Sequence, residues 1–312
     1  MESLLIAVQV VVPMAIMVGI GVLLRIFHVA DAPTMKKVDN MIFKVFMPTL
    51  SFYNIYKTDF SQMNNIAYIL YGVAVLMLLF LAAMTLVPRY VKPGPTAASF
   101  GQAIFRSNYL IFGAAVAESI YGAGNIGMVS LLGAVAVPLF NAQAAILLET
   151  ARHGTASTKK LLLAIAKNPT VIATVIGLGV NFSGIVLPEL VLKVVKDLSG
   201  LTTPLSFLSI GVTLSLGGVV VKKGYLVMGN LLRLVIIPAV FIPIAVLLGF
   251  HGQELCALLI LFAAPTAVSS YPMAVAMDAD GDFAAQMVAY TTVFCLPTIF
   301  LWTLAMNSFG LL

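Results

Sequence analysis

The sequence predicts an all-α polytopic membrane protein of ten transmembrane helices. The helices are expected to form two inverted five-helix repeats, in which the fourth and ninth spans are discontinuous and cross. Three observations predict this fold: the composition, the length of the apolar runs and a series of motif matches. Of the 312 residues, 61% are hydrophobic and 9% are charged, whereas about 25% of a soluble domain is charged. Lipid is therefore the solvent of most of this chain.

Ten apolar runs reach the length of about 20 residues that a helix needs to cross the hydrocarbon core of a bilayer. They cover residues 4–24, 38–56, 66–87, 99–121, 124–149, 168–187, 190–217, 224–250, 254–277 and 282–310. The first run follows no positively charged start and is too long for the apolar part of a signal peptide, so we expect it to be retained as a span. Lys44 and Pro48 interrupt the second run.

The distribution of Lys and Arg predicts the orientation. The loops on one side carry Arg25, Lys36, Lys37, Arg89, Lys92, Arg152, Lys159, Lys160, Lys167, Lys222 and Lys223. The loops on the other side carry only Lys57, Lys193 and Lys196. The basic side is expected to be cytoplasmic, which places both termini on the extracytoplasmic side. The expected location is the plasma membrane, which is the inner membrane in a bacterial cell.

Three further cations, Lys44, Arg106 and Arg233, lie within predicted spans. Each is close enough to the predicted cytoplasmic end of its span for the charged group to reach water. We therefore expect these side chains to snorkel toward the membrane surface.

Motif matches relate the first five spans to the last five, in the same order. The matches are VGIGV (18–22) with IGLGV (176–180), FMPTLSF (46–52) with TTPLSFLSIG (202–211), and SNYLIFGAAVAE (107–118) with SSYPMAVAMD (269–278). The predicted division is a first repeat at 1–152, a short cytoplasmic linker at 153–163 and a second repeat at 164–312. Because five is odd, the second repeat must be inverted, and inverted repeats are a signature of secondary transporters.

Two of the matching motifs contain residues that interrupt or end helices. Gly113, with Asn108 and Tyr109, predicts a break in the fourth span, and Pro272, preceded by Ser269, Ser270 and Tyr271, predicts its counterpart in the ninth. Interrupted helices occur in a membrane only where protein or a water-filled cavity surrounds them. Two breaks that meet near the middle would expose amide N–H groups and positive half-helix ends, which form an anion site.

These seven residues are the candidate substrate-binding set, and three others are secondary candidates. The secondary candidates are Ser51, Ser206 and Arg106. Structural alternatives stay open: polar side chains in spans often bond a neighbouring helix, tyrosines often only pack, and hydroxyls near a proline satisfy the freed backbone.

The motifs resemble those of the auxin efflux carrier family and its bacterial relatives, which include malate and malonate permeases. In SNYLIFGAAVAESIYG the resemblance rests on Asn108 at the start and on Tyr121 and Gly122 at the end; PMAVAMD, FMPTLSF and TTPLSFLSIG resemble the ninth, second and seventh spans. The resemblance to this family implies two crossing discontinuous helices and a scaffold of other spans. It also implies a carboxylate substrate near the crossing and paired protomers. Plant members carry a proline in the fourth-span break, where this chain has Ala114 and Ala115.

The sequence therefore predicts a secondary transporter that moves a small organic anion, a mono- or dicarboxylate, across the bilayer by alternating access. An anion channel or uniporter on the same fold is the alternative, because broken helices also build pores. The sequence contains no metalloprotease motif or other intramembrane enzyme pattern, so we expect no enzymatic activity, catalytic residue, cofactor or metal. A coupling ion, H⁺ or Na⁺, stays open, and the scattered basic residues argue against nucleic acid as a partner.

Overall fold

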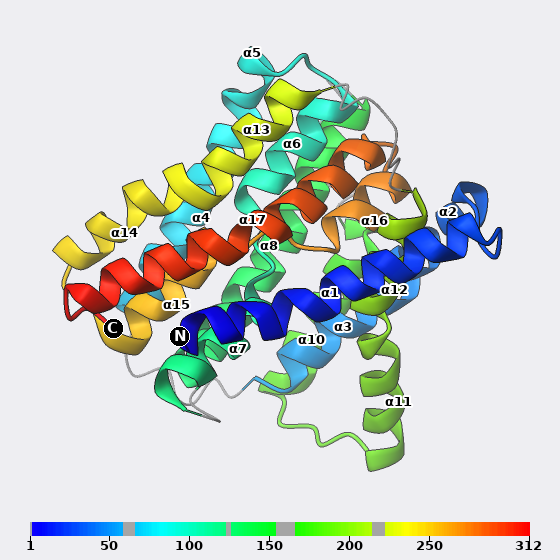
Figure 1. Ribbon diagram of the computed structural model, residues 1–312. Helices are drawn as coiled ribbons and strands as arrows, with labels where there is room; N and C mark the ends of the chain where they lie inside the picture. Colours follow the sequence, from blue (N-terminus) through cyan, green and yellow to red (C-terminus); the bar gives the residue numbers. More distant parts are fainter. Residues whose placement is uncertain (1, 59–65, 123–125, 154–165, 214–221) are drawn as a thin grey trace.

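The computed structural model of the protein describes residues 2–58, 66–122, 126–153, 166–213 and 222–312 (Figure 1). Within these ranges the chain is helical, without strands apart from one isolated β-bridge. The helices in the first predicted half are α1 (Glu2–Ile26), α2 (Ala32–Met41), the π-turn η1 (Ile42–Phe46), α3 (Met47–Tyr56), α4 (Ala67–Thr85), α5 (Val87–Tyr90), α6 (Pro95–Phe105), α7 (Tyr109–Tyr121) and α8 (Gly127–His153). Those in the second are α10 (Pro169–Phe182), α11 (Glu189–Gly200), α12 (Thr202–Thr213), α13 (Lys223–Leu231), the π-turn η3 (Leu232–Ile236), α14 (Ile237–Leu247), α15 (Gly252–Ala263), α16 (Ser270–Ala276) and α17 (Gly281–Ser308).

Four helical stretches among the described residues are long and apolar enough to cross a membrane. They are Ala67–Tyr90, Gly127–Arg152, Lys223–Leu247 and Gly281–Ser308. Pro169–Phe182 and Gly252–Ala263 are apolar but shorter. The protein is thus all-helical and polytopic, whereas the count of ten spans and their inverted repeat stay predictions.

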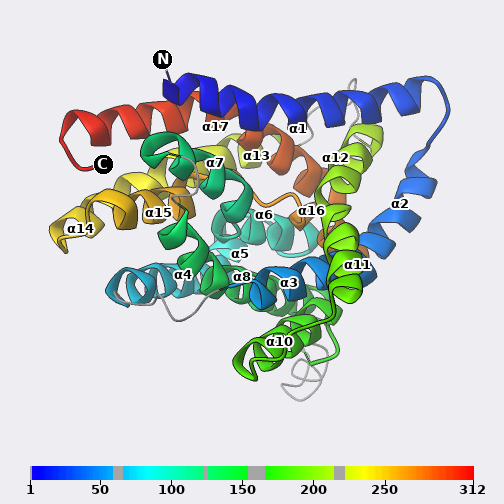
Figure 2. The same ribbon diagram turned by 90° about the horizontal axis from the view of Figure 1, so that it is seen from below.

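The interrupted helices occupy the centre of the molecule. In Figure 2, α6, α7, α15 and α16 lie between α1 and α17 on one side and α3, α8 and α10 on the other. All residues of α15 from Leu255 to Ala263 are buried, as expected for a helix that is apolar all round and enclosed by protein.

Glycines bring two helix pairs into backbone contact. A Cβ atom on Gly21 of α1 would overlap the carbonyl oxygen of Leu208 in α12, and one on Gly211 of α12 would overlap that of Val18. Small residues allow such close approach between membrane helices. On the other side of the molecule, α10 packs along α3, where a Cβ atom on Gly177 would stand 3.3 Å from the carbonyl oxygen of Phe52, a tight contact without overlap. The first helix of each predicted half therefore packs against the second predicted span of the other half.

The second and eighth apolar runs each contain a proline, yet the chain remains helical through it. A proline lacks the N–H group of a regular helix and collides with the carbonyl four residues earlier. The π-turn η1 widens the helix just before Pro48, and η3 does the same before Pro238. These π-turns accommodate the prolines without ending the helical path.

Several expectations for single segments need correction. The seventh run, predicted as one span at 190–217, divides at Leu201, because Pro204 lacks an N–H group and fits the first turn of a new helix. Its last residues, 214–217, lie outside the described residues, as does the predicted linker apart from His153. The snorkelling expectation is wrong for Arg106 and Arg233, whose exposed fractions are 2% and 0%.

Candidate functional site

The centre of the molecule contains two interrupted helices that pair through their backbones. Helix α6 ends at Phe105 and α7 begins at Tyr109, while α15 ends at Ala263 and α16 begins at Ser270. The extended residues between them form an antiparallel bridge at Ser107 and Thr266. The two hydrogen bonds run from Asn108 N to Pro265 O, at 2.8 Å, and from Ala267 N to Arg106 O, at 3.0 Å.

The interruptions include the predicted Asn108 and Ser269, but both lie earlier in the chain than Gly113 and Pro272. Gly113 lies inside α7, where a Cβ atom would stand 2.5 Å from Cγ1 of Val129. This glycine therefore serves packing against α8 and does not open the helix. Pro272 lies in the first turn of α16, where its missing N–H group costs nothing, and the break ends before it.

Arg233 satisfies the carbonyl groups that the interruptions leave open. Its Nε donates to the carbonyl of Ala264 at 2.8 Å, and its two terminal nitrogens donate to those of Ile104 and Leu261, each at 3.0 Å. One guanidinium thus joins the carboxyl ends of α6 and α15, where cations are favoured by the helix dipoles. The side-chain hydroxyl of Thr266 adds a further bond to the carbonyl of Ala103.

The expectation of free amide groups at the crossing is wrong for the amides that bond across it. The amide N–H groups of Asn108 and Ala267 donate to the facing segment, and that of Thr266 donates to the hydroxyl of Thr291. The amides of Ser270 and Tyr271 close local turns. These five amides are therefore not available to a ligand.

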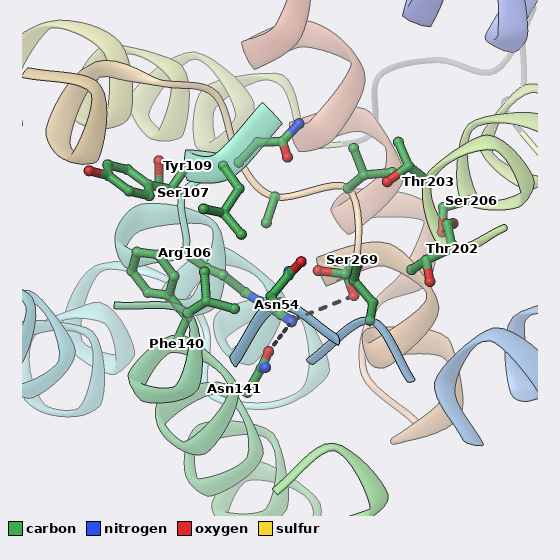
Figure 3. Close-up of a pocket in the computed structure, with 16 residues that line it drawn as sticks. Asn54, Arg106, Ser107, Tyr109, Phe140, Asn141, Thr202, Thr203, Ser206 and Ser269 are labelled. Carbon is green, nitrogen blue, oxygen red and sulfur yellow. Dashed lines mark hydrogen bonds between the residues drawn. The ribbon is translucent and has the colours of Figure 1, made fainter. Parts of the chain in front are cut away.

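A cavity of about 250 Å³ lies beside the crossing (Figure 3). One wall comes from the interrupted helices and the other from α3, α8 and α12. The lining residues are Leu50, Asn54, Arg106, Ser107, Asn108, Tyr109, Leu110, Val137, Phe140, Asn141, Thr202, Thr203, Ser206, Ala267, Val268 and Ser269. Ten of these residues carry polar side-chain groups, and none of the described lining residues is acidic.

Arg106 is the cation of this cavity. Its guanidinium donates to Oδ1 of Asn141 at 2.8 Å and, at 3.5 Å, to the carbonyl of Ser269, the two dashed contacts in Figure 3. It also approaches the sulfur of Met273 at 3.1 Å. Among the described residues no carboxylate forms an ion pair with it. Nδ2 of Asn108 is a second buried donor in the cavity wall and has no partner there.

The structure brings five of the predicted residues to the cavity: Asn108, Tyr109, Ser269, Ser206 and Arg106. Gly113, Ser270, Tyr271 and Pro272 do not line it. Ser51 lies just behind the wall, where its hydroxyl accepts a 3.0 Å hydrogen bond from Asn141.

Sequence reasoning missed five polar lining residues: Asn54, Ser107, Asn141, Thr202 and Thr203. Asn141 follows Pro138 in a long apolar run. A polar amide side chain within a membrane span was the sequence signal that could have identified it. Within the described part of the chain, no group of three or more His, Cys, Asp or Glu side chains is arranged to hold a metal ion.

Comparisons with known proteins point to one class. Residues 6–303 match the family described as Membrane transport protein. A Methanocaldococcus jannaschii protein named as an uncharacterized transporter is 25% identical over 314 aligned residues, which cover 96% of this chain and 98% of that protein. Both matches are to membrane transporters and not to enzymes.

Proposed function

The chain belongs to the Membrane transport protein family, the auxin efflux carrier family that its motifs resemble, and from that premise we propose a secondary transporter for a small organic anion. The proposed mechanism is alternating access. The substrate class is a mono- or dicarboxylate of the size of malonate or malate.

The observation that carries this proposal is the buried guanidinium of Arg106 in a cavity without acidic residues. An isolated charge in the membrane interior is costly, and such residues commonly mark substrate pathways. Since Asn141 and the carbonyl of Ser269 are neutral acceptors, the positive charge of Arg106 is left uncompensated by them. An anion in the cavity would supply the missing negative charge.

A carboxylate suits the donors of this cavity better than a spherical anion does. The guanidinium of arginine presents a planar set of N–H groups that match the two oxygens of a carboxylate. Nδ2 of Asn108, two residues after Arg106 in the same extended segment, offers another donor. The volume of about 250 Å³ is below the ~300–1,000 Å³ range of sites for drug-sized ligands, which favours a small acid.

The position of the cavity supports alternating access. Arg106 and Ser269 belong to the crossing, whereas Asn54 of α3 and Thr203 of α12 face them from the other wall. Movement of the crossing against α3 and α12, the second and seventh predicted spans, would carry the bound anion relative to the membrane. The bonds of Arg233 and of the backbone bridge would hold the crossing together during that movement.

The test is transport by the purified protein in proteoliposomes. A panel of small mono- and dicarboxylates is applied while currents are recorded on a solid-supported membrane, and counterflow of labelled acid detects electroneutral exchange. Saturable transport is expected. Arg106→Gln should raise the half-saturating concentration about 10- to 100-fold, the range for loss of a hydrogen bond to a charged group. Arg89→Gln, at an exposed position of α5, is the matched control.

Two outcomes would contradict the proposal. Transport by Arg106→Gln and by Asn108→Ala at the wild-type rate would remove the anion site from this cavity. Anion flux that does not saturate would favour the alternative, an anion channel or uniporter on the same fold.

A charge placed beside Arg106 gives a sharper comparison. Asn141→Asp puts a carboxylate where the amide oxygen now accepts from Arg106, so the guanidinium would gain an internal partner and lose its preference for an external anion. Asn141→Ala removes the same hydrogen bond without adding charge. We expect the aspartate variant to lose at least tenfold more apparent affinity than the alanine variant, and equal losses would contradict the role of the free charge.

A further inference from the structure

A second buried charge lies outside the anion cavity. Asp39 of α2 has an exposed fraction of 0%, and neither of its carboxylate oxygens has a hydrogen-bond partner among the described residues. No described cation forms an ion pair with it. Helix α2 packs here against α12 and α16. An ionised carboxylate that is buried without a partner costs free energy, and burial therefore favours its protonated form.

The neighbours of Asp39 are hydroxyl groups that bond one another. Ser209 donates to the hydroxyl of Tyr271 at 3.4 Å, and the hydroxyls of Thr213 and Tyr271 lie 3.1 Å apart. The hydroxyl groups of Ser209 and Tyr271 adjoin the carboxyl group and are uncharged donors. Among the described residues, no cation forms an ion pair with Asp39 that would hold it ionised.

A separate cavity of about 500 Å³ leads to this carboxyl from the predicted cytoplasmic side. Asp39 and Tyr271 line its inner part, and the exposed Lys36, Asp278 and Asp282 line its outer part. Two of the acidic groups around the cavity form ion pairs: Asp278 pairs with Arg152 at 2.8 Å, and Asp280 pairs with Lys222. None of the residues that line this cavity also lines the anion cavity.

Two helices connect Asp39 to the anion cavity. Ser209 lies one turn beyond Ser206 in α12, and Tyr271 lies two residues beyond Ser269, whose carbonyl accepts from Arg106. A change of charge at Asp39 would thus act on the same segments that form both walls of the anion cavity.

We propose that Asp39 is a proton-binding carboxyl that couples anion movement to a proton gradient. The inference rests on the proposed function and adds the coupling ion to it. The proton enters from the cytoplasmic cavity, neutralises the carboxylate in the closed arrangement, and leaves when movement of α16 rehydrates the group.

The transport test uses proteoliposomes in which a pH gradient of one unit is imposed in each direction. One coupled proton would support about tenfold accumulation of the anion per pH unit. Asp39→Asn should reduce the accumulation ratio to about one, while Asp282→Asn, at an exposed position of the same cavity, should keep it. Accumulation by Asp39→Asn equal to wild type, or accumulation driven by sodium in place of the pH gradient, would overturn the proposal.

A spectroscopic measurement separates this inference from the proposed substrate. Infrared spectra of the purified protein are recorded at about pH 5.5, where an exposed aspartate with a pKa of about 3.9 is ionised. Wild type and Asp282→Asn should show the carbonyl band of a protonated buried carboxyl, and Asp39→Asn should lack it. The same band in Asp39→Asn would overturn the inference even if the anion is transported, and loss of the band would support it even if no acid in the panel is transported.

Discussion

Arg106 and Arg233 are both buried arginines near the crossing, but their hydrogen bonds give them different tasks. Arg233 donates to three backbone carbonyls that would otherwise be unsatisfied. Arg106 has one such contact and faces the cavity. Loss of the first should mainly affect folding, and loss of the second should mainly affect transport.

We expect Arg233→Lys to destabilise the protein by about 2–4 kcal/mol, because an ammonium cannot reach three diverging carbonyls and buried acceptors would be left unpaired. The indole of Trp302 donates to the carbonyl of Leu234, next to Arg233, and Trp302 is the only tryptophan in the sequence. Thermal unfolding followed by its fluorescence therefore measures the effect. Arg106→Lys serves as the comparison, and an equal loss of stability in both variants would contradict the division of tasks.

At the residue scale the sequence predicts the general place of the site better than its members. Asn108, Tyr109 and Ser269 line the cavity because they flank the interruptions. Tyr271 follows Ser269 closely but turns toward Ser209 and Thr213. Side-chain direction in the first turn of a half-helix depends on the surrounding packing, which a linear motif does not contain.

The contact between α1 and α12 determines stability at the scale of elements. Gly211→Ala should destabilise the protein by about 1–3 kcal/mol, since the added Cβ atom would overlap the carbonyl oxygen of Val18 and force the helices apart. Gly19→Ala is the matched control in α1, because a Cβ atom there would meet no described atom of another helix within 4 Å. Equal melting temperatures of the two variants in detergent would contradict the close contact.

The ion pair of Lys222 and Asp280 joins the starts of α6, α13 and α17, because the carboxylate also accepts from Thr96 at 2.6 Å and from Phe283 N at 3.0 Å. Burial raises the pKa of Asp280, but the hydrogen bonds from Lys222, Thr96 and the backbone of Phe283 outweigh it and hold the pKa below 3.8. The folded protein thus binds this proton less readily than the unfolded chain does. The stabilisation is complete well above pH 3.8 and is lost as the pH falls through the lowered pKa.

Asp280→Asn should therefore lower the melting temperature at neutral pH. The difference from wild type should shrink as the pH falls below 3.8, where the native carboxylate takes up its proton. Melting curves recorded across this pH range provide the measurement. A constant difference down to strongly acidic pH would contradict the role of the charge.

The boundaries of the interruptions illustrate what local sequence omits at this scale. Glycine and proline predicted breaks at Gly113 and Pro272, yet the helices open at residues 106–108 and 264–269. Extended backbone is stable there because each segment supplies hydrogen-bond partners to the other. That pairing joins residues more than 150 positions apart, between Ser107 and Thr266, so no local propensity could locate it. The apolar, helical character of the chain depends on its hydropathy and was predictable.

At the scale of the whole molecule, the excess of Lys and Arg on one side predicts that both termini lie outside the cytoplasm. Alkaline phosphatase fused after Leu312 should be active in a bacterial host, and green fluorescent protein at the same place should be dark. A fusion after Arg152, which lies on the basic side, should show the reverse pattern. The same reporter activity at both fusion sites would contradict the predicted orientation.

The packing of α1 on α12 has a consequence for biogenesis. The ribosome completes α1 first, but its main partner exists only after Thr202 and the rest of α12 have been synthesised. During that interval α1 lies in the translocon or in lipid, and the face that carries Gly21 has no partner helix. Ribosome stalling between α8 and α12 should therefore yield nascent chains in which α1 is bound by insertion chaperones. The two halves, expressed as separate polypeptides, should associate in the membrane.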